Sequence, residues 1–189
     1  MSSPASVPTD ERVRLFCGLR LPDIVLETLE RWQAEHVGRG RPVSRQNLHV
    51  TLAFLGWTAR DRVDAVVAAL REAAGTARPI RLEPVRYRET RSVGMVVLSD
   101  EARAAGELAE DLHGRLERLG VYEREVREWL PHLTVVRFKE RPRLRPPLPE
   151  TGPFTPSDAA AYLSRLRPSG AEYVVLESVH LNRKTRGGN

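Results

Sequence analysis

Two copies of one short phrase carry the residues best suited to chemistry in this chain. The phrase His-x-Thr occurs with His49 and Thr51 and again, 83 residues later, with His132 and Thr134. Each copy lies in an apolar run typical of a β-strand, where residues two apart share one face. Imidazoles exchange protons near neutral pH, and hydroxyls can donate hydrogen bonds to phosphate oxygens. Two such strands at one cleft would therefore suit a metal-free acid–base phosphoesterase.

The two strands that must position these residues are expected at residues 47–55 and 131–138. Their opposite faces are apolar and consist of Leu48, Val50, Leu52, Leu133 and Val135. An apolar back and a polar front predict strands that lie on a core and face an open cleft.

The same order of elements, a strand, a helix and then the His strand, precedes each phrase. The distance from Val13 to His49 is 36 residues, and that from Met95 to His132 is 37. This regularity predicts two related lobes that face each other across a pseudo-two-fold axis. The other strands are expected at residues 13–19, 79–88, 93–98, 159–166 and 172–181. Three helices are expected: the first at residues 22–36, the second beginning at a cap formed by Asp61, and the third at residues 101–119, where Gly120 ends it.

Length, charge and cysteine content limit the class of protein. The chain has 189 residues, a net charge of +5 and a pI near 10.0. No apolar run approaches the roughly 20 residues that span a bilayer, and the N-terminus lacks the pattern of a secretory signal. The single cysteine, Cys17, excludes an internal disulfide, and its apolar neighbours predict a buried side chain. We expect a cytoplasmic protein that does not bind membranes.

The domain organisation follows from composition. Residues 1–11 are small and polar and predict a disordered tail, residues 12–182 a single bilobal domain, and residues 183–189 a basic tail. The positive charge favours an RNA or nucleotide substrate, although an arginine-rich proteome would give the same charge without such a role.

Three stretches of the sequence resemble a known family. Residues 14–22, 47–56 and 131–137 are similar to the bacterial and archaeal RNA 2′,3′-cyclic phosphodiesterases, the 2′-5′ RNA ligase family of the two-histidine phosphoesterase superfamily. The resemblance implies a bilobal α+β fold, with two mostly antiparallel sheets facing each other across a central cleft and helices on the outer faces. It also implies hydrolysis of RNA 2′,3′-cyclic phosphate ends or cyclic nucleotides to 2′-phosphates, with no metal or other cofactor.

The same resemblance assigns roles to the phrase residues. It makes His132 the proton acceptor that activates water and His49 the proton donor at the 3′-oxygen, whereas the residues alone leave the two interchangeable. Thr51 and Thr134 are expected to bind the nonbridging phosphate oxygens, where negative charge grows in the transition state.

Two further substrate-binding residues are expected on weaker grounds. Arg137 follows His132 by five residues, so strict alternation places it on the opposite face. It can reach the phosphate only if the strand twists, bulges or ends there. Phe16 could stack on a nucleobase at the rim of the cleft, and core packing is the alternative.

Different functions are also compatible with the sequence. A metal-dependent hydrolase would need further ligands, and neither His strand has an HExxH motif or an acidic cluster beside it. A non-catalytic RNA-end binding module and a physiological 2′-5′ ligase both stay open, and nothing demands more than a monomer. We expect the remaining histidines, His36, His113 and His180, at the surface or at the edge of the core. A basic loop with Arg39, Arg41 and Arg45 precedes the first His strand, and it could follow an RNA backbone or simply be solvated.

Overall fold

The computed structural model describes residues 11–168 and 170–181. The predicted tails at 1–11 and 183–189 therefore lie outside the described residues, apart from Glu11. Three helices and eight strands occur in the described part of the chain. The helices are α1 (Asp23–His36), α2 (Val63–Thr76) and α3 (Ala104–Arg118). The strands are β1 (Arg12–Arg20), β2 (Arg41–Pro42), β3 (His49–Ala59), β4 (Glu83–Glu89), β5 (Val93–Ser99), β6 (His132–Arg137), β7 (Asp158–Arg167) and β8 (Gly170–His180).

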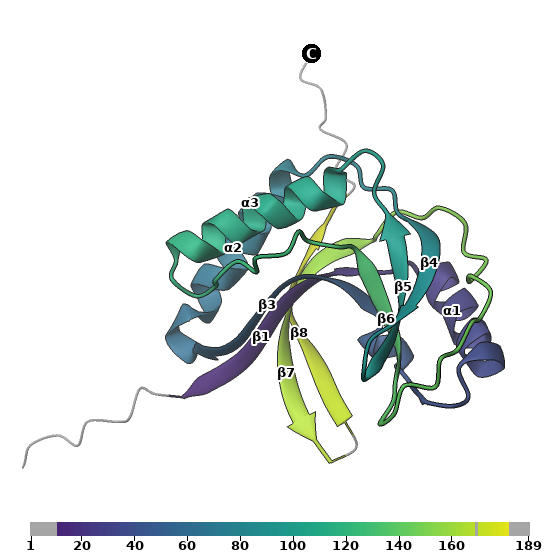
Figure 1. The fold of residues 1–189 in the computed structure, drawn as a ribbon. Helices are drawn as coiled ribbons and strands as arrows, with labels where there is room; N and C mark the ends of the chain where they lie inside the picture. Colours follow the sequence, from purple (N-terminus) through teal and green to yellow (C-terminus); the bar gives the residue numbers. More distant parts are fainter. Residues whose placement is uncertain (1–10, 169, 182–189) are drawn as a thin grey trace, which may run out of the picture.

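The strands form one antiparallel sheet in the order β4-β5-β6-β3-β1-β7-β8, and the short β2 pairs with β6. The α+β class is thus confirmed, but the two separate sheets expected from the sequence are joined into one. The two His strands, β3 and β6, are themselves neighbours, through the pair of Val50 and Leu133. Figure 1 shows the result as a curled sheet, with β4, β5 and β6 on one side and β1, β7 and β8 on the other.

The helices are exchanged between the two halves of the sheet. In sequence, α1 lies between β1 and β3, yet it packs beside β6. Conversely, α3 lies between β5 and β6, yet it packs against β3 and against α2. Figure 1 shows α1 next to β4, β5 and β6, and α2 and α3 over β1 and β3. Each helix therefore supports the His strand of the other repeat unit, and one apolar core includes residues of both units.

Local sequence signals account for most element ends. Helix α1 begins directly after Pro22, and Gly120 follows α3 with a φ of +69°. Helix α3 begins at Ala104, three residues later than expected, because Arg103 adopts a left-handed conformation with φ of 56°. The prediction that Asp61 caps α2 is wrong, since that residue lies in a 3₁₀ turn, Arg60–Arg62, and makes no capping hydrogen bond.

The single cysteine and the helices agree with the expectations from composition. Cys17 is fully buried in β1, and burial raises the pKa of its thiol to about 12. A thiol in this state is a small apolar side chain of the core. Among the described helices, none combines the length and the apolarity that crossing a membrane requires.

Candidate active site

The pairing of β3 with β6 brings the two His-x-Thr phrases side by side. Val50 pairs with Leu133, and both are fully buried on the core face. Continuing this antiparallel register places His49 opposite Thr134 and Thr51 opposite His132. Residues opposite each other in such a pair have Cβ atoms about 4.5–5.5 Å apart, and diagonal neighbours roughly 7–8 Å apart. The four side chains therefore form a compact group in which each imidazole has a hydroxyl across from it.

The group opens into a cavity of about 440 Å³. Both histidines and both threonines line it, together with three arginines, Arg14, Arg41 and Arg137, whereas the described lining contains no aspartate or glutamate. A cavity of this size and charge suits a small anionic group such as a phosphate ester.

The two imidazoles are held in the same way. His49 Nδ1 lies 2.8 Å from the carbonyl oxygen of Asn47, and His132 Nδ1 lies 2.8 Å from that of Leu130. A carbonyl only accepts, so each Nδ1 carries a proton and donates it. Each Nε2 is then the nitrogen left to exchange protons with a substrate. His49 Nε2 also lies 3.1 Å from Thr51 Oγ1.

Aromatic rings surround His49. Its ring centroid is 4.7 Å from that of Phe16, 5.5 Å from that of Tyr173 and 5.9 Å from that of Tyr162. Burial is the main cause that lowers the pKa of His49 to about 4, and the charges of His132 and Arg137 lower it further. The hydrogen bond to Asn47 acts in the opposite direction. His49 is therefore neutral at pH 7 in the ligand-free protein.

Phe16 lines the cavity next to His49, but it presents little of its ring there. It is only 2% exposed and stacks on Tyr162 at 4.6 Å between centroids. This position favours the alternative role in core packing over contact with a base. The half-buried Tyr173, which also lines the cavity, offers a more accessible ring, and nothing in the sequence pattern pointed to it.

Gly18 makes room for the His49 ring. A Cβ atom at this position would lie 2.9 Å from the Val50 carbonyl oxygen and 3.1 Å from Cδ2 of His49. Any larger residue would therefore displace either the strand or the imidazole. The sequence signal was a glycine inside an otherwise apolar strand, which indicates a close approach of another group.

A β-bulge follows each His-x-Thr phrase. In β6, Thr134 pairs with Met95 and Val136 with Gly94, so that Val135 is the additional residue. In β3, Thr51 pairs with Gly18 and Ala53 with Cys17, so that Leu52 is the additional residue. Each bulge reverses the alternation of side chains beyond it.

The reversal turns Arg137 toward the histidines. Arg137 lines the cavity and acts electrostatically on His49, so the bulge that this orientation requires is present. The equivalent residue after the first bulge is Phe54, five residues beyond His49, which also lines the cavity and is 49% exposed. Simple alternation could not have identified Phe54, because it places this residue on the core side.

Side chains from the exchanged helices bind the carbonyl groups at the bulges. His113 of α3 donates from Nε2 to the Leu52 oxygen at 2.8 Å, and Gln33 of α1 donates from Nε2 to the Val135 oxygen at 2.6 Å. Both donors are buried, with 5% and 4% exposure. His113 was expected at the surface or core edge, and the structure instead places it under the first His strand.

The basic loop contributes only part of its charge to the cavity. Arg41 lines it, whereas Arg45 forms ion pairs with Asp23 and Glu30 on α1. Arg39 is exposed and does not line the cavity. Within residues 11–168 and 170–181, no group of three or more His, Cys, Asp or Glu side chains is arranged to hold a metal ion.

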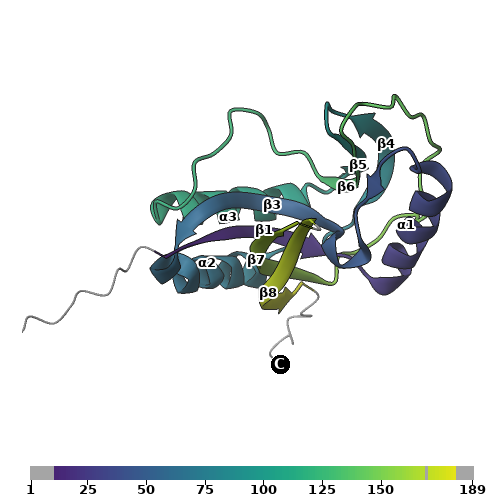
Figure 2. The same cartoon turned by 90° about the horizontal axis from the view of Figure 1, so that it is seen from below.

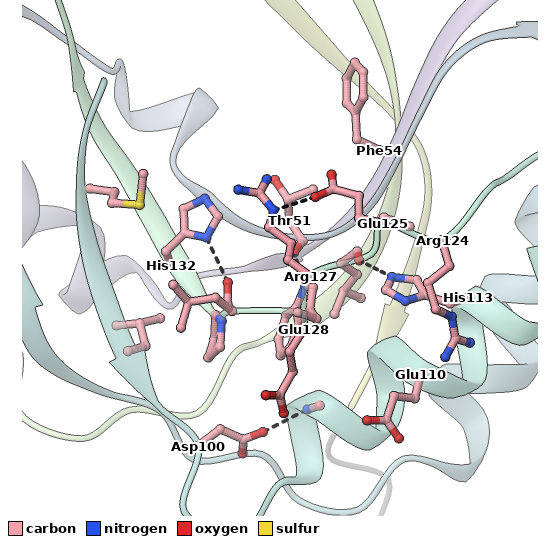
Figure 3. Close-up of a pocket in the computed structure, with 18 of the residues that line it drawn as sticks. Thr51, Phe54, Asp100, Glu110, His113, Arg124, Glu125, Arg127, Glu128 and His132 are labelled. Carbon is pink, nitrogen blue, oxygen red and sulfur yellow. Dashed lines mark hydrogen bonds and ion pairs between the residues drawn. The ribbon is translucent and has the colours of Figure 1, made fainter. Parts of the chain in front are cut away.

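A second and larger cavity adjoins the first. It measures about 1180 Å³ and lies beneath the segment that joins α3 to β6, which rises beside β3 as an extended loop in Figure 2. Thr51, Phe54 and His132 line both cavities. Figure 3 shows Thr51 and His132 in this larger cavity, with loop residues Glu125 and Arg127 beside Thr51. The loop is fastened to β3 by Trp129, whose Nε1 donates to the Thr51 oxygen at 3.0 Å.

A curled antiparallel sheet whose central strands each present a histidine and a threonine to one cleft is the arrangement of the two-histidine phosphoesterases. The chain belongs to the 2′-5′ RNA ligase superfamily, whose family model matches residues 21–171.

Individual relatives agree with this assignment. The chain is 25% identical over 169 residues to the RNA 2′,3′-cyclic phosphodiesterase of Escherichia coli (strain K12), covering 88% of this chain and 96% of that protein. It is 24% identical over 183 residues to the protein of the same name from Methanocaldococcus jannaschii, covering 87% and 99%.

Solved structures share the whole fold. E. coli LigT complexed with 3′-AMP superposes with a TM-score of 0.76 at 26% identity, covering 90% of this chain and 99% of that chain. TT0787 of Thermus thermophilus gives a TM-score of 0.75 at 30% identity, covering 89% and 97%. The similarity therefore extends over both His strands and both halves of the sheet.

Proposed function

We propose that this protein hydrolyses RNA or nucleoside 2′,3′-cyclic phosphate ends to 2′-phosphates, using His49 and His132 as a metal-independent acid and base. The observation that carries the proposal is the pair of imidazoles on adjacent strands, each with Nδ1 bound to a carbonyl and Nε2 available. The names of the two phosphodiesterase relatives support the choice of substrate.

The reaction requires two proton transfers and one displacement at phosphorus. The basic imidazole takes a proton from water through Nε2, and the water oxygen forms a bond to phosphorus. The bond from phosphorus to the 3′-oxygen breaks, and the acidic imidazole protonates that oxygen. The product carries a 2′-phosphate and a free 3′-hydroxyl.

Three side chains can stabilise the negative charge that develops on the phosphate. Thr51 and Thr134 donate hydroxyl hydrogen bonds to nonbridging oxygens, and the Arg137 guanidinium adds a charged donor. Their common position on the cavity wall supports this role. Phe16 also lines the cavity but is only 2% exposed, which favours a role in supporting the His49 imidazole.

The assignment of acid and base rests on the family resemblance, which makes His49 the proton donor and His132 the acceptor. Because the pKa of His49 is lowered to about 4, His49 must gain a proton before it can donate one. A phosphate anion between the two imidazoles favours the charged form and raises this pKa. The donor role of His49 therefore requires that the bound substrate raise the pKa of this imidazole, so that His49 is protonated when the reaction begins.

A diester with a nitrophenolate leaving group distinguishes the two roles, because such a group departs without protonation. If His49 is the acid, His49→Ala loses far less activity on bis(4-nitrophenyl) phosphate than on a cyclic nucleotide, whereas His132→Ala loses activity equally on both. The opposite pattern would exchange the assignments.

The decisive test of the proposal uses protein treated with EDTA and a nucleoside 2′,3′-cyclic phosphate, with chromatography of the products. We expect complete conversion to the 2′-phosphate in excess chelator. Loss of turnover in chelator, with recovery on adding a divalent metal, would support the metal-dependent hydrolase instead. Binding without turnover would support the non-catalytic RNA-end module. Sedimentation of the same sample tests a separate prediction, that the protein is a monomer.

A further inference from the structure

The larger cavity beneath the segment that joins α3 to β6 extends the site beyond the reacting phosphate. It has more than twice the volume of the cavity at the histidines, and the two share Thr51, Phe54 and His132. The two cavities therefore adjoin at the histidines, where a chain that ends at the reacting phosphate would continue into the larger one. A mononucleotide would leave this second space unused.

The strand β4 supplies a basic wall to this cavity. Arg86 and Arg88 of β4 line it, at the two-residue spacing that places side chains on one face of a strand, and Thr90, just past the end of β4, lines it too. Within the described residues, neither Arg86 nor Arg88 forms an ion pair with a carboxylate. Two cations held without internal counter-charges on the wall of a cavity are available to an external anion.

The acidic residues of the cavity are placed differently. Glu110 and Glu125 form ion pairs with Arg103 and Arg127, and Asp100 accepts a hydrogen bond from the Gly106 backbone. Figure 3 shows Asp100 and Glu110 beside α3, away from His132 and Thr51. The lining also includes Glu128 on the loop, so the carboxylates are divided between the loop and the region of α3. The wall along β4 contributes arginines and no carboxylate to the lining, and a polyanion would follow that wall.

An exposed aromatic ring stands where the two cavities meet. Phe54 is 49% exposed, and the guanidinium of Arg14 lies 4.9 Å from its ring centroid. An exposed aromatic ring beside a positively charged groove is the pattern by which proteins hold single-stranded nucleic acid, because any base can stack on the ring. Phe54 is therefore placed to stack on a base next to the reacting nucleotide.

We propose that the larger cavity is a subsite for single-stranded RNA, in which Phe54 stacks on the base that precedes the cyclic end and Arg86 and Arg88 bind the phosphates farther upstream. This proposal rests on the proposed function, since it gives the direction in which the rest of the substrate leaves the histidines. It makes the protein an enzyme of RNA ends, with mononucleotides as minimal substrates.

The test compares two substrates, a cytidine 2′,3′-cyclic phosphate and a pentaribonucleotide that ends in the same group, on the wild type and on Arg86→Gln/Arg88→Gln. The matched control is Arg31→Gln/Arg62→Gln, which removes the same charge from exposed residues that line neither cavity. We expect the β4 variant to lose about tenfold in kcat/KM on the pentanucleotide, to change less than twofold on the mononucleotide, and to reduce the salt dependence on the pentanucleotide by about one unit of log–log slope.

The outcomes separate this proposal from the proposed function. Equal losses on both substrates, or a loss in the control variant as large as in the β4 variant, would overturn the subsite. So would an unchanged kcat/KM on the pentanucleotide. A wild-type protein that hydrolyses neither substrate would instead overturn the proposed function.

Discussion

The two His-x-Thr regions differ in their surroundings far more than in their backbone. Both phrases lie on central strands, both imidazoles donate from Nδ1 to the carbonyl two residues earlier, and both phrases are followed by a bulge. Yet His49 contacts the rings of Phe16, Tyr162 and Tyr173, whereas no aromatic ring packs on His132 in the described part of the chain.

The difference shows how one motif can supply two chemically distinct imidazoles. The shared backbone geometry gives both rings the same tautomer, so that geometry alone does not distinguish an acid from a base. Burial, to which the aromatic packing contributes, is the main cause that lowers the pKa of His49 to about 4, and the charges of His132 and Arg137 lower it further. Environment, and not the motif, separates the two histidines.

The largest expected effect comes from removing either imidazole. We expect His49→Ala and His132→Ala each to lower kcat by about 10²–10⁴-fold, since each removes one of the two proton transfers. Single-turnover hydrolysis of a cyclic nucleotide measures the loss, and far-ultraviolet circular dichroism checks the fold. His36→Ala, in a histidine of α1 outside both cavities, is the control. Near-wild-type turnover in either His49→Ala or His132→Ala would contradict the expectation that both imidazoles take part in the reaction.

The two threonine variants should differ from each other in their pH–rate profiles. Thr51→Val and Thr134→Val each remove a hydroxyl donor to the phosphate, for which losses of about 10²–10³-fold in kcat are typical. Thr51 Oγ1 also lies 3.1 Å from His49 Nε2, so its removal should in addition change the pH–rate profile. We expect the Thr134 variant to keep the wild-type profile. Identical profiles for both variants would show that the contact between Thr51 and His49 has no role in turnover.

Stability against acid should reveal the packing of His49. Its pKa is lowered from 6.5 to about 4 on folding, so the unfolded chain binds the proton more tightly between these values. The free energy of unfolding should therefore fall as the pH is lowered from 7 to 4, with a contribution of no more than about 3 kcal/mol from this residue. Urea unfolding at both pH values measures it. His49→Asn should reduce this fall in the free energy of unfolding. His132→Asn should retain most of the part due to His49, because burial lowers the pKa of His49 more than the charge of His132 does. An unchanged fall in His49→Asn would contradict the assignment.

The smallest effects are expected at the bulges. Gln33→Leu leaves the Val135 carbonyl without its side-chain donor, and His113→Leu does the same for the Leu52 carbonyl. Each should lower the free energy of unfolding by about 1–3 kcal/mol. If the bulges position Arg137 and Phe54, Gln33→Leu should raise the KM for a cyclic mononucleotide, and His113→Leu should act mainly on the longer RNA. If each variant changed the KM equally on both substrates, the bulges would have no specific role in positioning Arg137 and Phe54 for the substrate.

Much of the site could be predicted from the sequence because strand alternation is a local property. His49 and Thr51 share one face of their strand because they are two residues apart, and the same holds for His132 and Thr134. The apolar residues between them lie on the opposite face and pack on the core. The repeated order of strand, helix and His strand could likewise be recognised from spacing.

What lies beyond the phrases could not be predicted in the same way. The orientation of Arg137 and Phe54 depends on bulges at Val135 and Leu52, which no alternation pattern reveals. The burial of His113 and Gln33 depends on the exchange of α1 and α3 between the halves. The union of the two expected sheets depends on one pair of residues in β3 and β6.

By itself, the sequence determined which residues are the candidates for the chemistry and that two similar strands carry them, because residue type and period are written in the chain. Only the tertiary structure decided that these strands are neighbours and that their imidazoles differ. Neighbouring strands and unequal burial arise from contacts between segments far apart in the sequence. The side chains of Phe16, Tyr162 and Tyr173 become a single environment for His49 only when β1, β7 and β8 assemble beside β3.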